Sequence, residues 1–306
     1  MLDNRHVVAY WRQAMYKHAL IITAYNEIDF LIELLQTYSK YFKVYVHIDK
    51  KCKITPKQAE ILDEICNGRI IQKYKIAWGS YKHILAILDL LKLGMDDGCD
   101  FFSVISANTI PIKNQEYIKK YFQEKNKIFM EYFDKEKLNK KQILEIFEYR
   151  TKVYYFQHLF AFRKGTKFFD YKYLLEQKLA NFQYRIGIRR NISFRYKGYV
   201  YCHFPLCGAK VVTEYLEENP NYIKKLKYCY VGEEYFFQNI FMKSDLANRV
   251  INSSQVYDIW SQERGNPAFL NVNDFVSLKN TECLFARKVS SQDKDLFFKI
   301  KEAENF

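Results

Sequence analysis

The segment Ala19-Leu-Ile-Ile-Thr-Ala24 decides the fold class, because it is a continuous apolar run of strand length with a helical pattern directly behind it. Asn26 is placed to cap that helix. The apolar side chains of the helix recur every three or four residues, at Phe30, Leu31, Leu34, Leu35 and Tyr38. The segment therefore predicts a buried strand followed by an amphipathic helix.

Strands and helices keep alternating up to residue 133. The apolar runs predict further strands at 44–48, 69–72, 101–105 and 128–132. Helices are predicted around 56–65, from Ser80 through Leu91, and behind the cap residue Asn114. This alternation is typical of a doubly wound, Rossmann-like α/β sheet that is mostly parallel and flanked by helices.

Such sheets bind ligands beyond the carboxyl ends of their strands, where Thr23, Ala24, Asp49 and the segment 106–109 fall. The chain has neither the GxGxxG fingerprint of dinucleotide-binding enzymes nor the GxxxxGK[ST] loop of P-loop enzymes. The remaining common occupant of this crevice is a nucleotide-sugar, which this half of the chain therefore predicts as its ligand.

The rest of the chain is less regular. Residues 134–197 are charged, aromatic and poorly periodic, with helical stretches suggested at 137–147 and 171–185 and no fold assigned. Apolar segments return at 199–212, followed by a helix at 213–218 and by another that Gly232-Glu233-Glu234 opens.

The domain organisation follows from the lack of any internal repeat or linker in the sequence. We expect one domain over 15–306, with a nucleotide-binding half at 15–133 and a mixed acceptor and catalytic half at 134–306. Residues 1–14 precede a second methionine and are interpreted as an appendage.

Lys and Arg outnumber Asp and Glu by 48 to 35, and the net charge of +13 predicts a polyanionic partner, whether nucleic acid, an anionic membrane face or a phosphorylated substrate. Seven irregularly spaced cysteines predict reduced thiols in a cytosolic compartment. No apolar run approaches the length that spans a bilayer, and no signal peptide is apparent. The expected location is the cytoplasm, with peripheral contact to an anionic membrane left open.

Six segments carry a resemblance to a known family. They are Val46-His-Ile-Asp49-Lys-Lys51, Ala77-Trp78-Gly-Ser80, Phe101–Lys113, Val231–Phe237, Asp258-Ile-Trp260-Ser261 and Leu284-Phe-Ala-Arg287-Lys288. In this order they resemble the core-2/I-branching β-1,6-N-acetylglucosaminyltransferases and the related peptide xylosyltransferases, glycosyltransferase family 14, as a bacterial-type member. The likeness spans roughly residues 17–122 and 199–290 and covers the middle third poorly.

The resemblance implies a GT-A fold and an inverting, metal-independent transfer of GlcNAc or a related sugar from a UDP-sugar to a hydroxyl. Glu234 matches the general base of the family, with Glu233 beside it as an acceptor contact. Arg287 and Lys288 match the pair that holds the pyrophosphate, where preorganised cations replace a metal ion. The other implied contacts are Thr23, Ala24, Asp49 and Trp78 on the donor side, and Trp260 and Arg150 on the acceptor side.

Each of these roles has a structural alternative. Glu233 and Glu234 would complement a helix N-terminus or exchange roles, and Asp49 would cap a turn. Trp78 is expected to be a packing anchor near the donor rather than a direct ligand. His158, in the same basic-aromatic stretch as Arg150, would be a buried structural histidine.

Two departures from the family pattern limit the transfer of its contacts. Thr109 stands where the family usually carries Asp, and the segment 203–208 lacks the Trp of the acceptor strand. The only Asp-x-Asp, Asp293-Lys-Asp295, falls in a charged C-terminal helix and is expected to face solvent rather than to hold a metal. The donor contacts are therefore in doubt, and a different acceptor is expected.

The preferred interpretation is a glycosyltransferase with a UDP-sugar donor, a glycan, lipid-linked or protein acceptor, no cofactor and no nucleic-acid partner. The alternative from another class is a nucleic-acid- or anionic-surface-binding protein that uses the basic-aromatic stretch 182–197. A third reading is a relative that has kept the fold and lost catalysis.

Overall fold

The computed structural model of the protein describes residues 16–162, 165–261 and 267–306. Within these ranges one sheet has the strand order β3-β2-β1-β4-β7-β6-β8. Its strands are β1 (His18–Ala24), β2 (Lys43–Ile48), β3 (Ile70–Ile71), β4 (Phe101–Ser106), β6 (Ile128–Asp134), β7 (Tyr196–Pro205) and β8 (Val250–Asn252). The appendage predicted at 1–14 lies outside the described residues.

The sheet is parallel in its first half and mixed in its second. β1 pairs in parallel with β2 and β4, and β2 pairs in parallel with β3. β7 runs antiparallel to both β4 and β6, whereas β8 is parallel to β6. The expected α/β class, a mostly parallel sheet flanked by helices with a mixed second half, is confirmed.

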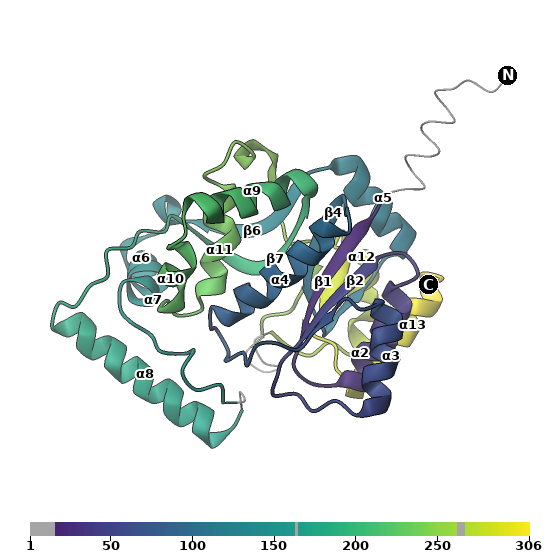
Figure 1. The fold of residues 1–306 in the computed structure, drawn as a ribbon, viewed down its shortest axis with the longest axis horizontal. Coiled ribbons are helices and arrows are strands. Elements are labelled where there is room, and N and C mark those ends of the chain that lie inside the picture. Colours follow the sequence, from purple (N-terminus) through teal and green to yellow (C-terminus); the bar gives the residue numbers. More distant parts are fainter. Residues whose placement is uncertain (1–15, 163–164, 262–266) are drawn as a thin grey trace.

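Helices cover both faces of the sheet and bury it (Figure 1). One layer contains α2 (Ile28–Tyr38), α3 (Pro56–Cys66), α5 (Gln115–Lys125), α12 (Phe275–Asn280) and α13 (Lys294–Ala303). The other contains α4 (Lys82–Asp96), α9 (Leu206–Glu218), α10 (Tyr222–Lys227) and α11 (Phe236–Phe241). In Figure 1 the first layer lies to the right of β1 and the second to its left. Burial of each Leu, Ile or Phe side chain stabilises the folded state by about 1.5–3 kcal/mol. Because helices cover both faces of the sheet, nearly all the side chains on both faces of β1 are buried, and most of them are apolar.

A second, three-stranded sheet joins the two ends of the chain. It consists of β5 (Thr109–Pro111), β10 (Phe285–Arg287) and β9 (Val256–Tyr257), in the order β5-β10-β9. β10 runs antiparallel to β5, and this register places Arg287 opposite Thr109. The small sheet thus brings a C-terminal arginine to the carboxyl end of β4.

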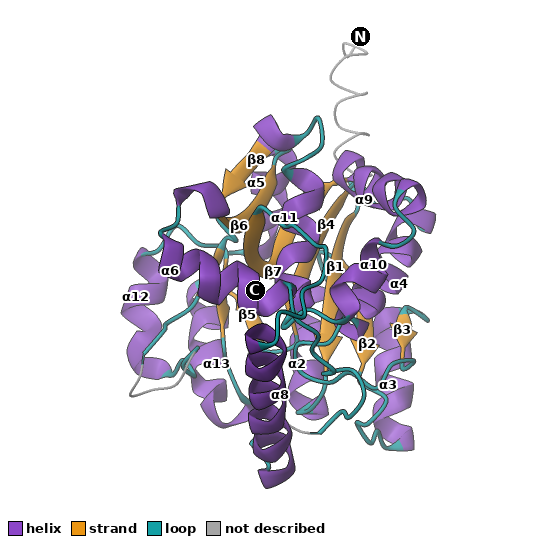
Figure 2. Cartoon of the chain, turned by 90° about the vertical axis from the view of Figure 1, so that its left-hand side faces the viewer, coloured by secondary structure: helices purple, strands orange, loops and turns teal. Residues whose placement is uncertain are grey.

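The middle of the chain, which the sequence left without a fold, forms helices. A helical run comprises α6 (Lys140–Ile143), a π-helical turn (Leu144–Glu148) and α7 (Tyr149–Thr151). A longer helix, α8 (Lys167–Arg185), starts four residues ahead of its predicted position. Figure 1 shows α8 at the lower left, on the outside of the molecule and away from the sheet, and in Figure 2 the same helix faces the viewer.

Three predicted helix starts are wrong. α2 begins behind Glu27 and not with an Asn26 cap, because Glu27 adopts φ 53° and its carboxylate accepts hydrogen bonds from the Ser291 N–H and hydroxyl. α4 begins behind Tyr81 rather than at Ser80, which is buried. α9 starts at Leu206, well before residue 213, because Pro205 ends β7 and a proline cannot donate a ladder hydrogen bond. The predicted Asn114 cap is confirmed, since its side chain accepts from the N–H groups of Glu116 and Tyr117.

Candidate active site

The candidate site lies beyond the carboxyl ends of β1, β2 and β4. The strand order reverses between β1 and β4, which is the position where open α/β sheets bind their ligands. The register sets Thr23 beside His47 and Ser106, so the three strands end at one level. Thr109 closes the turn behind β4, because its buried hydroxyl bonds to the hydroxyl of Ser106 at 2.9 Å.

Two of the predicted donor residues shape the backbone at this edge. Asp49 is buried, and its carboxylate accepts hydrogen bonds from the N–H groups of Lys51 (2.8 Å) and Ile76 (3.2 Å). Ala24 packs in the core while its carbonyl accepts from the Asp49 N–H. The neighbouring Tyr25 is 58% exposed at the end of β1. Direct contact of Asp49 and Ala24 with a uridine stays a prediction.

Thr23 belongs to a hydrogen-bonded row that the sequence did not reveal. Its hydroxyl lies 2.9 Å from Nε2 of His83, near the start of α4. Nδ1 of the same imidazole lies 2.7 Å from Oε2 of Glu233. His83 therefore links the end of β1 to the predicted acceptor-side carboxylate.

The pKa of His83 is raised above 6.5, because the negative charge of Glu233 and the hydrogen bond to it outweigh burial, which alone would lower it. A raised pKa stabilises the folded protein fully below pH 6.5, and that contribution is lost as the pH rises through the folded-state pKa. We expect His83→Gln to cost about 1–3 kcal/mol near pH 6 and less toward pH 8. Urea unfolding of both proteins across this range measures the difference.

His158 is the matched control for that experiment. It packs edge-on against Tyr81 and Tyr228, and burial lowers its pKa to about 4. Its effect has the opposite sign, because the unfolded chain binds a proton that the folded protein refuses, so stability falls as the pH drops below 6.5. A difference between wild type and His83→Gln that does not vary with pH would contradict the His83–Glu233 pair.

Glu233 and Glu234 lie on a short 3-10 turn, η3 (Gly232–Tyr235), that precedes α11. Val231 enters the turn at φ 52°, and its N–H donates to the side-chain oxygen of Gln157. A Cβ on Gly232 would lie 2.6 Å from the carbonyl oxygen of Leu226, so only glycine fits there. The predicted helical start is thus confirmed, with a tighter turn than expected.

Glu234 is held by two cations. Lys197 Nζ of β7 lies 2.8 Å from Oε2, and Arg150 Nη1 of α7 lies 3.3 Å from the same oxygen. Within the described part of the chain, Oε1 of Glu234 makes no hydrogen bond or ion pair. Its side chain is 20% exposed, so the carboxylate is oriented through one oxygen and keeps access to solvent.

Arg287 is buried at the end of β10. Its guanidinium lies over the ring of Tyr201, 4.5 Å from the centroid, and Nη1 is 4.0 Å from Oδ2 of Asp258. Among the described residues its Nε finds no hydrogen-bond partner. An unpaired buried donor is unusual and costly, which makes this guanidinium a candidate for an anionic ligand. Its neighbour Lys288 is half-buried, with Nζ 5.6 Å from the ring of Phe269.

An aromatic pair lies on the acceptor side. Trp260, 52% exposed, stacks on Tyr199 of β7 with ring centroids 5.8 Å apart. Burial raises the pKa of Tyr199, and the charges of Glu131, Asp258 and Glu234 raise it further while Arg287 lowers it. The charges of Glu234 and Arg287 thus both act on Tyr199.

The two other carboxyls whose charges act on Tyr199 have raised pKa values themselves. Burial raises the pKa of Glu131, helped by Asp258 and opposed by Lys197. Burial also raises the pKa of Asp258, against the charge of Arg287 and a hydrogen bond from Trp260. The β6–β7 register shifts between Met130 and Tyr132, and such bulges are common beside active sites because they re-aim a side chain, here Glu131.

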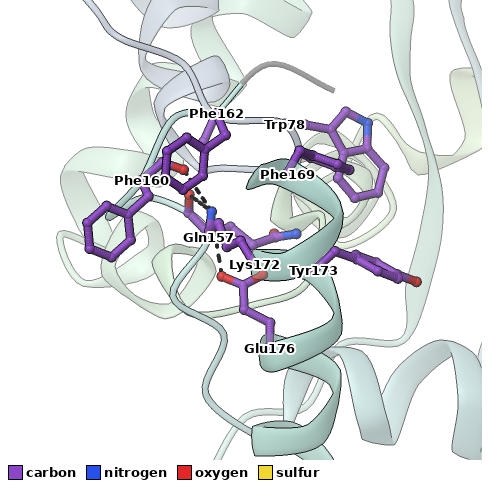
Figure 3. Close-up of a pocket in the computed structure, with 9 residues that line it drawn as sticks. Trp78, Gln157, Phe160, Phe162, Phe169, Lys172, Tyr173 and Glu176 are labelled. Carbon is purple, nitrogen blue, oxygen red and sulfur yellow. Dashed lines mark hydrogen bonds and ion pairs between the residues drawn. The ribbon is translucent and has the colours of Figure 1, made fainter. Parts of the chain in front are cut away.

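Trp78 packs against α8 and keeps 38% of its surface exposed. Its ring meets Phe169 and Tyr230 edge-on, at 6.1 Å and 5.7 Å between centroids. It also lines a small pocket beneath the start of α8 (Figure 3). The indole anchors the helix beside η3, and a direct donor contact stays a prediction.

The basic-aromatic stretch 182–197 uses most of its cations for internal contacts. Arg190 is buried and donates to the carbonyls of Thr151 and Lys225, and Arg195 pairs with Asp134 and Glu136. Arg189 stacks 3.6 Å over Tyr184 and donates to its carbonyl, while Lys197 holds Glu234. These contacts do not favour a nucleic-acid interface at this stretch.

Metal-binding side chains and membrane-spanning helices can be sought only among the residues that the structure describes. Those residues contain no group of three or more His, Cys, Asp or Glu side chains placed to hold a metal ion. The Asp-x-Asp of the C-terminal region begins α13, with Asp293 accepting from the Ser290 hydroxyl and Asp295 exposed.

None of the described helices is long and apolar enough to cross a membrane. All seven cysteines are free thiols.

Comparison with known proteins gives weak structural likenesses. A mannose-1-phosphate geranyltransferase from Thermus thermophilus is 10% identical, with TM-score 0.31 and coverage of 76% of this chain and 72% of that one. Core-mannan synthase A from Aspergillus fumigatus, in an Mn/GDP form, is 9% identical, with TM-score 0.33 and coverage of 77% and 72%. The galactosyltransferase LgtC, with donor and acceptor sugar analogs, is 10% identical, with TM-score 0.36 and coverage of 94% and 95%. No curated protein matches the chain.

The family comparison is decisive, because it spans most of the chain. The sequence model of the Core-2/I-Branching enzyme family matches residues 19–280, a range that holds β1 except His18, together with His83, η3 and the Asp258–Trp260 segment. The chain therefore belongs to the Core-2/I-branching enzyme family and is a glycosyltransferase.

Proposed function

We propose that the protein transfers a sugar, GlcNAc or a related one, with inversion from a UDP-sugar to an acceptor hydroxyl, and that it does so without a metal ion. The acceptor oxygen attacks the anomeric carbon while the bond from that carbon to the diphosphate oxygen breaks. The hydroxyl proton passes to Glu234, and the bonding electrons leave with UDP. Membership of the family and the geometry around η3 support this proposal.

The observation that carries it is the way Glu234 is held. A general base needs a fixed direction and a free lone pair within reach of the proton it takes. Lys197 and Arg150 fix Oε2, and Oε1 makes no bond within the described residues. Oε1 is therefore the atom that we assign to the acceptor proton.

The leaving diphosphate is the second charge that the site must stabilise. We assign it to Arg287 and Lys288, because a preorganised guanidinium and ammonium provide a planar fork and a point charge. The buried Nε of Arg287 supports this assignment. No step then requires a metal.

The acceptor side is assigned to Trp260, Glu233 and Arg150. The exposed indole, backed by Tyr199, offers a flat face to the apolar side of a sugar ring. Glu233, oriented by His83, is an acceptor for a sugar hydroxyl. The acceptor class is a glycan, a lipid-linked glycan or a protein.

UDP binding in the presence of EDTA tests the donor and the metal together. We expect titration calorimetry to show UDP binding with the affinity unchanged within about twofold when EDTA replaces Mn²⁺, since the cations of the site are part of the chain. A panel of UDP-GlcNAc, UDP-xylose, UDP-glucose and UDP-galactose, followed by UDP release, identifies the donor. UDP binding only with Mn²⁺, or no binding of any UDP-sugar, would refute the proposal.

A further inference from the structure

The outer face of α8 carries a stripe of exposed apolar side chains. At about 3.6 residues per turn, spacings of three and four residues place them on one side of the helix. Three of them are strongly exposed: Tyr171 by 80%, Phe168 by 72% and Leu175 by 66%. We call this set the outer stripe, and its members are Phe168, Tyr171, Leu175, Leu179, Phe182 and Ile186.

The inner face of α8 is firmly docked, so the outer stripe is not a product of loose packing. Lys172 donates to the carbonyls of Gln157 and Phe160, both at 2.8 Å, and lies 3.6 Å from Glu176 (Figure 3). One turn from the end of the helix, the side chain of Gln183 bonds to both the N–H and the carbonyl of Tyr154. These contacts hold the helix in one orientation and present the stripe outward.

Aromatic residues of the preceding loop extend the stripe. Phe160 is 59% exposed and stacks on Phe162, with centroids 5.9 Å apart. Phe162 in turn stacks on Phe168 of the helix, at 5.8 Å. Contiguous exposed apolar surface of this kind marks an interaction site.

The charges around the stripe identify the kind of partner. Lys167, Lys178 and Arg185 are exposed on α8, whereas Asp170 is the one exposed acid on the helix. Arg189, also exposed, follows directly behind the helix. An apolar stripe rimmed by cations is typical of helices that lie in the interface of an anionic membrane.

We propose that the outer stripe of α8 inserts into the surface of an anionic bilayer, with the helix lying in the membrane plane and its cations at the headgroups. A second copy of the chain is a poorer occupant, because it would bring a second set of the same cations toward the first. The net charge of +13 favours the same surface.

The position of α8 couples the membrane to the candidate site. Phe169 of α8 meets Trp78, which meets Tyr230, and Tyr230 also lies 5.3 Å beneath the guanidinium of Arg150. The helix that would lie in the membrane is therefore connected to Arg150, an acceptor-side residue, through two aromatic side chains. The binding itself does not rest on the proposed reaction and is measured without any substrate.

Sedimentation of the full chain with vesicles tests the proposal. We expect binding to vesicles of phosphatidylglycerol and phosphatidylcholine, weak binding to phosphatidylcholine alone, and release at high salt. Leu175→Glu/Phe182→Glu should weaken binding to the anionic vesicles at least tenfold. Val276→Glu on α12, at another strongly exposed apolar position, is the matched control and should bind like wild type. Thermal unfolding checks that all variants fold.

A second variant separates charge from apolar insertion. Lys178→Glu/Arg185→Glu should bind phosphatidylcholine as wild type does and lose its preference for the anionic vesicles. Absence of binding by wild type, or equal binding by the Leu175→Glu/Phe182→Glu variant, would overturn the proposal. The proposal would also be overturned if light scattering showed that wild type is a dimer and that the Leu175→Glu/Phe182→Glu variant is a monomer. The stripe would then be a contact between copies of the chain.

Discussion

Glu234→Gln is expected to lower the rate of sugar transfer by about 10²–10⁴-fold, which is the usual contribution of a positioned general base. The amide keeps the shape of the carboxylate and cannot take the acceptor proton. UDP binding should change by less than about threefold, because we assign Glu234 to the acceptor and not to the diphosphate. The measurements are UDP release from the donor that the panel identifies, and calorimetric titration with UDP.

Glu233→Gln is the informative partner variant. Glu233 is held by His83 and Glu234 by Lys197 and Arg150, so the two carboxylates have different neighbours on one turn. We expect the Glu233 variant to raise KM for the acceptor more than it lowers kcat. A larger loss of kcat in Glu233→Gln than in Glu234→Gln would exchange the two roles. Glu124→Gln, on an exposed face of α5, controls for a change of charge alone.

Arg287→Ala is expected to weaken UDP binding by about 10²–10³-fold, since a bidentate, charge-assisted contact to a phosphate in a buried site is among the stronger polar interactions. Arg287→Lys should recover only part of the affinity, because an ammonium provides a point charge without the fork. Calorimetry with UDP and with uridine separates the diphosphate contribution from that of the base. The uridine affinity should be the same in all three proteins.

The fold of the Arg287 variants needs its own control, because the side chain is buried over Tyr201 and near Asp258. Thermal unfolding reports any loss of stability, and Lys120→Ala removes a cation from the exposed face of α5 for comparison. UDP affinity that is unchanged in a folded Arg287→Ala protein would remove this residue from the diphosphate site.

The parts of the fold that the sequence predicted are those with a local signal. The strands β1, β2 and β4 are apolar runs, and the Asn114 cap is a contact within three residues. The middle of the chain predicts helical stretches but no fold, because the apolar stripe of α8 faces solvent and so does not indicate the face by which the helix docks. Its inner face is fixed by polar contacts to distant carbonyls, which no local window contains.

The residues of the candidate site likewise fall into those that the sequence predicts and those that only the fold brings together. Glu233, Glu234 and Arg287 fall within segments that resemble the family. The structure links Glu233 through His83 to Thr23 at the end of β1, and it places Arg287 opposite Thr109 behind β4. His83 has no motif of its own, and its partner Glu233 lies 150 residues away. Lys197 falls in the basic-aromatic stretch 182–197, and its contact with Glu234 depends on the fold, which sets the start of β7 beside η3. No local sequence pattern predicts the His83–Glu233 contact or the Lys197–Glu234 contact.

The pairing of β10 with β5 has a consequence for the order in which the parts of the protein fold during synthesis. Thr109 leaves the ribosome early, and its partner in the ladder, Arg287, leaves much later. The parallel core around β1, β2 and β4 can form on the growing chain, because domains begin to fold from the N-terminal side as they emerge. The arginine that we assign to the diphosphate arrives after that core and closes a long loop. A nascent chain can therefore pair β1 with β2 and β4 before it has the arginine of its proposed donor site or the late helices α12 and α13 that complete one layer of the core. Activity is expected only once β10 has been added.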